Sequence, residues 1–211
     1  MIDPQTLRMA ETHLAGRDRR LRRLIEAHGP CRLGQRRRDP FHVLCASIIS
    51  QQLSTKAADA IMARVAVAAG ARNRFMPRHF LSVDLRLLRD AGLSNAKARW
   101  LTALAKAVDG GELDFKALRK QPDERALEVL DALPGIGRWT AEMFLIFALD
   151  RLDIFSISDV GLRRALDHLH NGGGRLDDGA ARRITQRWIP YRSVASWYLW
   201  RLTDGDVGTW T

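Results

Sequence analysis

The sequence has only two cysteines, Cys31 and Cys45, among its 211 residues. Two cysteines exclude a disulfide framework and a metal cluster held by four thiolates. Six histidines are present, but only His168 and His170 stand close together, and no third ligand accompanies them. A catalytic metal ion usually needs at least three protein ligands, so the sequence predicts none.

Long apolar runs are also missing. No stretch reaches the roughly 20 apolar residues that a membrane-spanning helix needs, and the N-terminus lacks the apolar core of a signal peptide. Apolar residues nevertheless make up 46% of the chain, which is typical of a globular protein. We therefore expect a soluble, monomeric, intracellular protein, cytoplasmic or nuclear, with no membrane partner.

Strand patterns and repeats are absent too. No segment alternates apolar and polar residues between turn signals, and no repeat of the solenoid type occurs. Apolar residues instead recur at helical spacing along most of the chain, as in Ser94 to Val108. The sequence predicts an all-α protein of about ten helices, organised as one domain over residues 1–211 with two lobes.

Several helix starts can be placed from their capping residues. Asp39 is followed by Pro40, a residue favoured at the first helical position. Ser54, Ser82 and Ser158 each precede a segment with helical spacing, and each is predicted to cap it.

Lysine and arginine outnumber aspartate and glutamate, which gives a formal charge of +10. Such an excess favours polyanions, and nucleic acid is the first candidate for a soluble protein. An arginine-rich, solvated surface is the alternative, and for the arginines between Arg17 and Arg23 it is the interpretation that we prefer. Lys97, Arg99 and Lys106 are expected on solvated or phosphate-facing sides of their helix.

The most informative stretch is Leu133-Pro134-Gly135-Ile136-Gly137. It predicts a tight hairpin between two helices, within about 124–150, because glycine accepts backbone angles closed to other residues. The amides of Gly135 to Arg138 open the second helix, and unpaired amides at a helix start bind anions such as phosphate. Downstream, Ser158-Asp159-Val160 begins another helix with an acid in its first turn.

This combination resembles the helix-hairpin-helix DNA glycosylases with a Gly/Pro-rich loop and a catalytic Asp, in particular the 3-methyladenine DNA glycosylase II branch. Three motifs carry the resemblance in order: Ile48-Ile49-Ser50-Gln51-Gln52-Leu53-Ser54, Leu133-Pro134-Gly135-Ile136-Gly137-Arg138-Trp139-Thr140-Ala141 and Trp188-Ile189-Pro190-Tyr191-Arg192-Ser193. The similarity spans roughly residues 40 to 204. It is to the compact form without an extra N-terminal domain, and it implies a cleft between the two lobes.

The resemblance implies a monofunctional enzyme that flips alkylated purines out of double-stranded DNA and excises them in base excision repair. Asp159 then becomes the catalytic carboxylate. The pocket positions of the family fall on Trp139, Trp200, Met143 and Val160, of which the last two depart from the tyrosine that the family can carry. Bifunctional members have a lysine where this chain has Trp139, so no Schiff base is expected.

The same resemblance assigns the DNA-binding residues. Gln52 occupies the position of the wedge that fills the gap left by the extruded base, whereas the alternative from the residues alone is that Gln51 and Gln52 cap a turn between helices. The remaining expected DNA contacts are Ser54, Gly135, Ile136, Gly137, Arg138 and Thr140.

Two other functions stay open at this point: a non-catalytic helix-hairpin-helix module that grips DNA, and a glycosylase for another damaged base. An iron–sulfur cluster, common in the endonuclease III branch, is excluded by the cysteine count. The family also makes a monovalent ion at the hairpin plausible, and no other cofactor is expected.

Overall fold

The structure is a computed structural model that describes residues 1–36 and 38–203. These residues form thirteen α-helices and no strand, so the prediction of an all-α fold is confirmed. The chain divides into two compact units, one made of Met1–Arg37 with Leu145–Thr211 and the other of Arg38–Phe144. We call them the terminal unit and the central unit, and each is described by itself.

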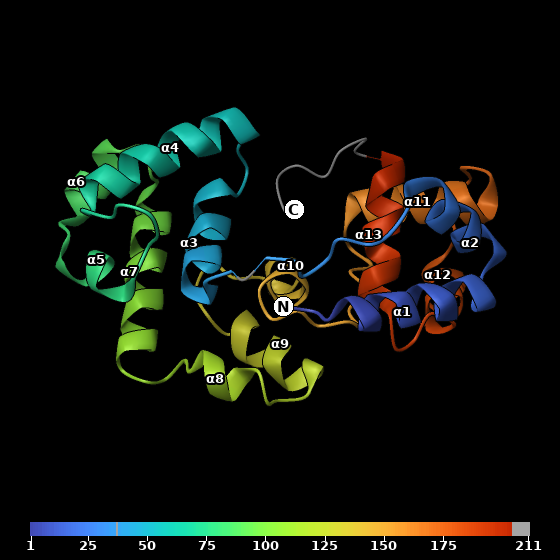
Figure 1. Ribbon diagram of the computed structural model, residues 1–211. Helices are drawn as coiled ribbons and strands as arrows, with labels where there is room; N and C mark the ends of the chain where they lie inside the picture. The colour runs from blue at the N-terminus through green and yellow to red at the C-terminus, as the bar shows by residue number, and fades with distance from the viewer. Residues whose placement is uncertain (37, 204–211) are drawn as a thin grey trace. The chain divides into compact units, whose positions relative to one another are not determined.

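The central unit contains the blue-green to yellow helices of Figure 1. Helix α3 is apolar nearly all round and is buried along most of its length, and α7 packs against it. The helices of this unit are α3 (Pro40–Ser50), α4 (Thr55–Ala68), α5 (Pro77–Ser82), α6 (Leu85–Asp90), α7 (Asn95–Asp109), α8 (Phe115–Leu118), α9 (Asp123–Asp131) and the first part of α10 (Arg138–Phe147).

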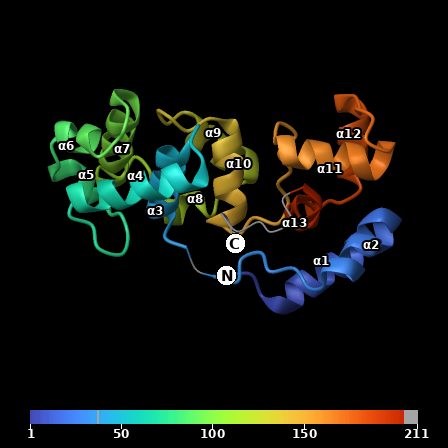
Figure 2. The same ribbon diagram turned by 90° about the horizontal axis from the view of Figure 1, so that it is seen from above.

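The terminal unit joins the two ends of the sequence, drawn in blue and in orange to red in Figure 2. Every residue of 193–200 is buried, so α13 is the central helix of this unit, with α1, α2 and α11 packed against it. Its helices are α1 (Pro4–Arg17), α2 (Arg19–His28), α11 (Val160–Asn171), α12 (Asp178–Gln186) and α13 (Arg192–Thr203).

Two of the capping predictions are confirmed. The Asp39 carboxylate accepts a hydrogen bond from the His42 amide at 3.0 Å, with Pro40 in the first turn of α3. Ser54 caps α4 through the Ala57 amide at 3.4 Å. These contacts lie within one turn of the chain, which is why the sequence alone locates them.

Two capping predictions were wrong for the same reason. Ser82 is the last residue of α5, which Pro77 begins, and the following helix α6 is capped by Asp84. Ser158 likewise precedes the true cap of α11, which is Asp159. Serine and aspartate cap helices about equally well, so a serine close to an aspartate does not decide which of them takes the cap position.

The N-terminal segment forms two helices because Asp18 interrupts it. The Asp18 carboxylate accepts from the Arg20 amide at 2.9 Å and from the Trp188 indole N–H at 3.1 Å, and the residue is buried. Arg17, Arg19, Arg20, Arg22 and Arg23 are all exposed around it. Exposure is required both for a solvated face and for a DNA contact, so the preference for a solvated face stays a prediction.

Within the described residues, no helix combines the length and apolarity that crossing a membrane requires. The tail from Asp204, expected to fray, lies outside the described residues.

Candidate functional site

Asp159 is fixed at the start of α11. Its side chain caps the helix, with Oδ1 accepting from the Leu162 amide at 2.8 Å. The same oxygen accepts from the Trp200 indole Nε1–H at 3.2 Å. The residue is only 9% exposed, so these N–H groups replace much of the water that a carboxylate otherwise needs. The cap position differs from the predicted first-turn position, but the helix dipole favours a negative charge at either place.

Trp200 is held on two sides within the terminal unit. Its indole donates to Asp159, and its ring stacks on Phe147 with a centroid distance of 5.5 Å and an interplanar angle of 30°. Gly161 leaves room for this arrangement, because an added Cβ would lie 3.3 Å from Asp159 Oδ1 and 3.5 Å from Trp200 Cδ1. The orientation of the carboxylate therefore depends on α11 and α13 together.

The other predicted pocket residues differ in exposure. Val160 follows Asp159 in the terminal unit and is 62% exposed. Trp139 is 39% exposed and Met143 is buried, and both belong to the central unit. The structure thus brings Asp159, Val160 and Trp200 together in one unit, while the role of all four pocket positions stays a prediction.

The turn that follows α3 carries both glutamines. The Leu53 amide donates to the Ser50 carbonyl at 3.1 Å, which closes a β-turn with Gln51 and Gln52 at its centre. Gln51 is half-buried, and its Nε2 donates to the Gly135 carbonyl of the hairpin at 2.8 Å. Gln52 is exposed at the tip with φ of 59°, a left-handed conformation that is rare for glutamine. The two glutamines are thus distinct: one bonds the hairpin, and the other is presented to solvent.

Lys97 was not expected in this site. Its Nζ donates to the Ile49 carbonyl at 2.8 Å and to the Gln51 carbonyl at 2.7 Å, rather than facing solvent or phosphate. Burial lowers the pKa of this ammonium. The sequence carried only a weak signal of this contact: no glycine follows α3, so its last carbonyls lack the commonest C-terminal cap.

The two hairpin glycines have different reasons to be glycine. Gly135 has φ of 83°, and an added Cβ would stand 2.5 Å from the Trp100 ring. Gly137 has no positive φ, and its Cβ would meet nothing within 4 Å. The prediction that both adopt angles closed to other residues is therefore right for Gly135 and wrong for Gly137.

The rest of the predicted phosphate-binding segment is partly engaged. Ile136 and Thr140 are buried, so their side chains serve the core. Arg138 is exposed, but its guanidinium bonds Glu124 at 2.9 Å and Glu142 at 3.1 Å, and the hydrogen bond with Glu124 raises its pKa. The Arg138 guanidinium is thus already paired with two carboxylates, and the binding of DNA by this segment stays a prediction.

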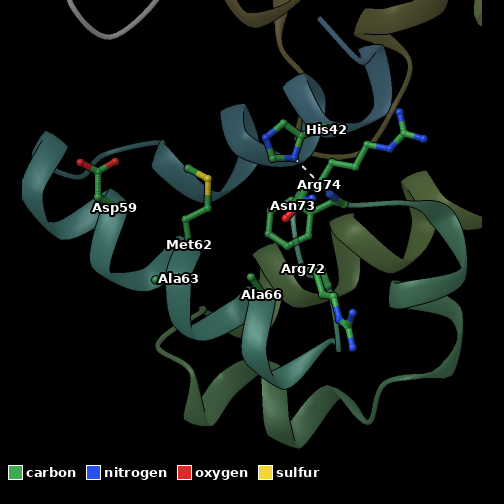
Figure 3. A pocket seen from close by; sticks show the side chains of 10 residues that line it. His42, Asp59, Met62, Ala63, Ala66, Arg72, Asn73 and Arg74 are labelled. Carbon is green, nitrogen blue, oxygen red and sulfur yellow. Dashed lines mark hydrogen bonds between the residues drawn. The ribbon is translucent and has the colours of Figure 1, made fainter.

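A separate pocket of about 280 Å³ lies in the central unit, between α3, α4 and the connection that follows α4 (Figure 3). Met62, Ala63, Ala66 and Phe75 are among its lining residues, and His42 accepts from the Phe75 amide at 3.2 Å. None of the predicted site residues lines it. Nor does any group of three or more His, Cys, Asp or Glu suited to a metal ion occur in the described part of the chain.

Comparison with known proteins places the chain in a family. Residues 45–191 match the model of the HhH-GPD superfamily base excision DNA repair proteins. DNA-3-methyladenine glycosylase 1 of Schizosaccharomyces pombe is 31% identical over 199 residues, which cover 93% of this chain and 87% of the relative.

Two solved structures agree with that result. The crystal structure of DNA-3-methyladenine glycosidase from Bacillus halodurans has a TM-score of 0.84 and 38% identity, covering 92% of this chain and 88% of the other. The Schizosaccharomyces pombe 3-methyladenine DNA glycosylase in complex with abasic DNA has a TM-score of 0.78 and 31% identity, covering 92% and 95%. The motifs, the all-helical fold and these matches together show that the chain belongs to the HhH-GPD superfamily of base excision DNA repair proteins.

Proposed function

We propose that this protein is a monofunctional DNA glycosylase that excises alkylated purines from double-stranded DNA, with Asp159 as its catalytic carboxylate. One observation carries the catalytic assignment: a largely buried carboxylate at a helix start, whose Oδ1 is fixed by two N–H donors. The names of its relatives and the abasic DNA in one related structure support the reaction class and the partner.

The reaction needs a stabilised cation more than it needs a strong acid. When the C1′–N bond breaks, its electron pair leaves with the base and positive charge develops on the sugar. An ionised carboxylate fixed beside that sugar lowers the barrier by electrostatic stabilisation. Water then adds to C1′ and loses a proton, which yields an abasic site and the free base. Asp159 suits this role because its orientation is set before the substrate arrives.

DNA is the partner that the charge and the hairpin favour. The formal charge of +10 attracts a polyanion, and backbone amides at the start of α10 suit a phosphate. A base inside a duplex is out of reach of any carboxylate, so the substrate base must be flipped out of the stack. In this proposal Gln52 is the wedge that fills the gap, and Ser54, two residues further on, caps the start of α4.

The preferred substrate in this proposal is a purine made cationic by alkylation, with 3-methyladenine as the leading candidate. A base that already carries positive charge leaves as a neutral molecule and needs no acid from the protein. Trp200, whose indole donates to Asp159, is the proposed aromatic wall, and a cation over an indole face gains about 0.5–2 kcal/mol. Neutral bases such as hypoxanthine are expected to react more slowly.

We also propose that any cation bound by the hairpin is monovalent. The Leu133 carbonyl accepts a hydrogen bond from the Ile136 amide, the Gly135 carbonyl accepts one from the Gln51 side chain, and a carbonyl oxygen has two lone pairs. Neutral carbonyl oxygens suit a weakly held monovalent ion, which would supply positive charge for a phosphate.

The test is chromatography of the bases released from methylated duplex DNA by the purified protein, with a hypoxanthine duplex run in parallel. We expect free 3-methyladenine and intact strands, and hypoxanthine at a lower rate. Borohydride should trap no covalent complex, because Trp139 stands where the bifunctional enzymes have lysine. DNA binding without release of any base would identify a non-catalytic module, and a trapped lysine adduct would contradict the monofunctional assignment.

A further inference from the structure

Lys97 stands where the local rules of helix formation disfavour it. Ser94 caps α7 through the Lys97 amide at 3.2 Å, and the third helical position after a serine cap is the favoured place for glutamate. A cation there opposes the dipole of its own helix. The Lys97 charge therefore gains nothing from its own helix, and its hydrogen bonds go to another element.

That contact is the C-terminal end of α3. The last carbonyls of a helix have no intrahelical partner, and here the Nζ of Lys97 bonds those of Ile49 and Gln51. The same ammonium that is unfavourable at the start of α7 is favourable at the end of α3, where the dipole is negative. Lys97 thus satisfies carbonyls at a helix end that has no glycine, while Gln52 adopts the left-handed conformation that glycine commonly has there.

The Gln51 carbonyl belongs to the central peptide of the β-turn. Gln51 has φ −49° and ψ 133°, and Gln52 has φ 59°, values that match a type II turn. Types I and II differ by a flip of this central peptide, and only type II puts the second central residue in the left-handed region, where glutamine is strained. The Lys97 hydrogen bond at 2.7 Å holds the carbonyl in the type II orientation.

Helix α7 supports the hairpin as well. Trp100, one turn after Lys97, is the residue whose ring lies against Gly135, and Gly135 in turn accepts from Gln51. Residues three apart share a face of a helix. One face of α7 therefore positions both the turn that presents Gln52 and the hairpin.

From this geometry we infer that Lys97 is a positioning residue for base flipping: it holds the turn after α3 so that the Gln52 side chain is presented as the wedge. The inference rests on the proposed function, in which Gln52 enters the duplex. Lys97 acts through the backbone of the turn and contacts neither the base nor a phosphate.

The experiment compares five variants with the wild-type protein. Lys97→Met keeps the length of the side chain and removes its donors, and Lys97→Arg restores a donor. Gln52→Ala removes the wedge, and Lys97→Met/Gln52→Ala combines the two changes. The matched control is Lys106→Met, which removes the same charge from an exposed position of α7. Thermal unfolding of each variant identifies any that fail to fold.

Three quantities are measured: base release from methylated duplex under single-turnover conditions, affinity for undamaged duplex, and fluorescence of a 2-aminopurine placed beside the damaged base. We expect Lys97→Met to lower the release rate and the flipping signal about tenfold, since both hydrogen bonds from the charged group, to the end of α3 and to the turn, are lost. Its affinity for undamaged duplex should equal that of Lys106→Met, and Lys97→Arg should recover most of the rate.

The double variant decides the mechanism. If Lys97 acts through Gln52, Lys97→Met should have no further effect once Gln52 is alanine. An equal fold-loss in both backgrounds, or Lys97→Met behaving like Lys106→Met, would overturn the inference. The inference would also be overturned if, for undamaged duplex, the slope of log affinity against log salt concentration of Lys97→Met were smaller by about one than that of Lys106→Met. Such a change marks a lost phosphate contact.

Failure of the proposed function is recognised separately. If the wild type releases no base, the glycosylase assignment fails, while the preference of each variant for an abasic-site duplex over an undamaged one still tests the wedge. If Lys97→Met loses the preference for the abasic-site duplex to the same degree as Gln52→Ala, the inference is supported. If Lys97→Met keeps this preference, the inference is overturned.

Discussion

The start of α11 and the turn after α3 both present one residue at a defined place, but they fix it differently. Asp159 is held by the Leu162 amide three residues away, with Trp200 as a second donor. The turn that carries Gln52 depends on hydrogen bonds between residues 46 to 84 apart in the sequence: Lys97 bonds two carbonyls, at the end of α3 and in the turn, and the Gln51 side chain bonds the Gly135 carbonyl of the hairpin.

This difference follows from what each residue is proposed to do. A catalytic carboxylate has to stay ionised in one orientation, and a helix start supplies the amides and the dipole for that locally. A wedge has to project from the protein surface into another molecule, and the tip of a turn is suited to that. Its backbone is therefore irregular, and irregular backbone needs contacts from other elements to stay in place.

The largest effect is expected for Asp159→Asn, which removes the charge and keeps the local cap. Asparagine caps helices as well as aspartate, so the free energy of unfolding should change by less than about 1 kcal/mol. Base release in single turnover should fall at least about a hundredfold, because the developing cation loses its counter-charge.

The control for that change is Asp177→Asn. Asp177 caps α12 in the same unit through the Ala180 amide at 2.7 Å, and its replacement should leave the rate unchanged. A loss of less than about tenfold for Asp159→Asn, roughly 1.4 kcal/mol, would mean that Asp159 is not the main catalyst.

The next largest effect should come from Gly135→Ala, which breaks the remote support of the hairpin. The new Cβ would meet the Trp100 ring at 2.5 Å, and φ of 83° is unfavourable for alanine. The steric clash and the unfavourable φ together predict a loss of about 2–4 kcal/mol in the free energy of unfolding, measured by urea denaturation.

Gly137→Ala is the matched variant, because its Cβ would meet nothing within 4 Å. We expect its stability to stay within about 1 kcal/mol of the wild type. Its affinity should fall for all duplex sequences alike, since a methyl group would stand where a phosphate approaches the backbone. Equal destabilisation by both changes would contradict the distinct roles of the two glycines.

The same contrast explains what could be predicted from the sequence. The helix starts at Asp39 and Ser54 follow from contacts within one turn, and the all-α class follows from helical spacing and missing strand patterns. Ser82 and Ser158 were misassigned because an aspartate nearby competes for the same cap position. Such errors move a boundary without changing the fold.

The parts that could not be predicted depend on distant contacts. Lys97 and Trp100 look like an ordinary surface cation and an ordinary apolar residue of α7, and nothing beside them in the sequence points to α3 or the hairpin. Gln51 and Gln52 are neighbours of identical type, yet only the fold shows that one bonds Gly135. The DNA-binding and pocket assignments of these residues stay predictions.

A smaller effect is expected for Trp200→Phe. This change removes the indole N–H that donates to Asp159 from α13 and keeps an aromatic ring against Phe147. A hydrogen bond to a charged group contributes about 1.5–3 kcal/mol, so the single-turnover rate should fall about tenfold or somewhat more. The control is Trp197→Phe on the same helix, because the Trp197 indole N–H donates no hydrogen bond within the described residues. Equal rates for the two variants would show that the donor does not matter.

The smallest effect should come from Gly161→Ala, which tests how closely α11 and α13 approach at Asp159. The added Cβ would lie 3.3 Å from Asp159 Oδ1 and 3.4 Å from Thr203 Oγ1, so these groups must shift by a few tenths of an ångström. Alanine is favoured over glycine in a helix by up to about 1 kcal/mol, and this gain should offset the crowding in the free energy of unfolding. The carboxylate would nevertheless be displaced from its donors, and catalytic groups tolerate displacements of only about 0.5 Å. We therefore expect unchanged stability and a two- to fivefold slower single-turnover release, about 0.4–1 kcal/mol in the barrier. A variant as fast as the wild type would show that the orientation of Asp159 comes from its helix cap alone.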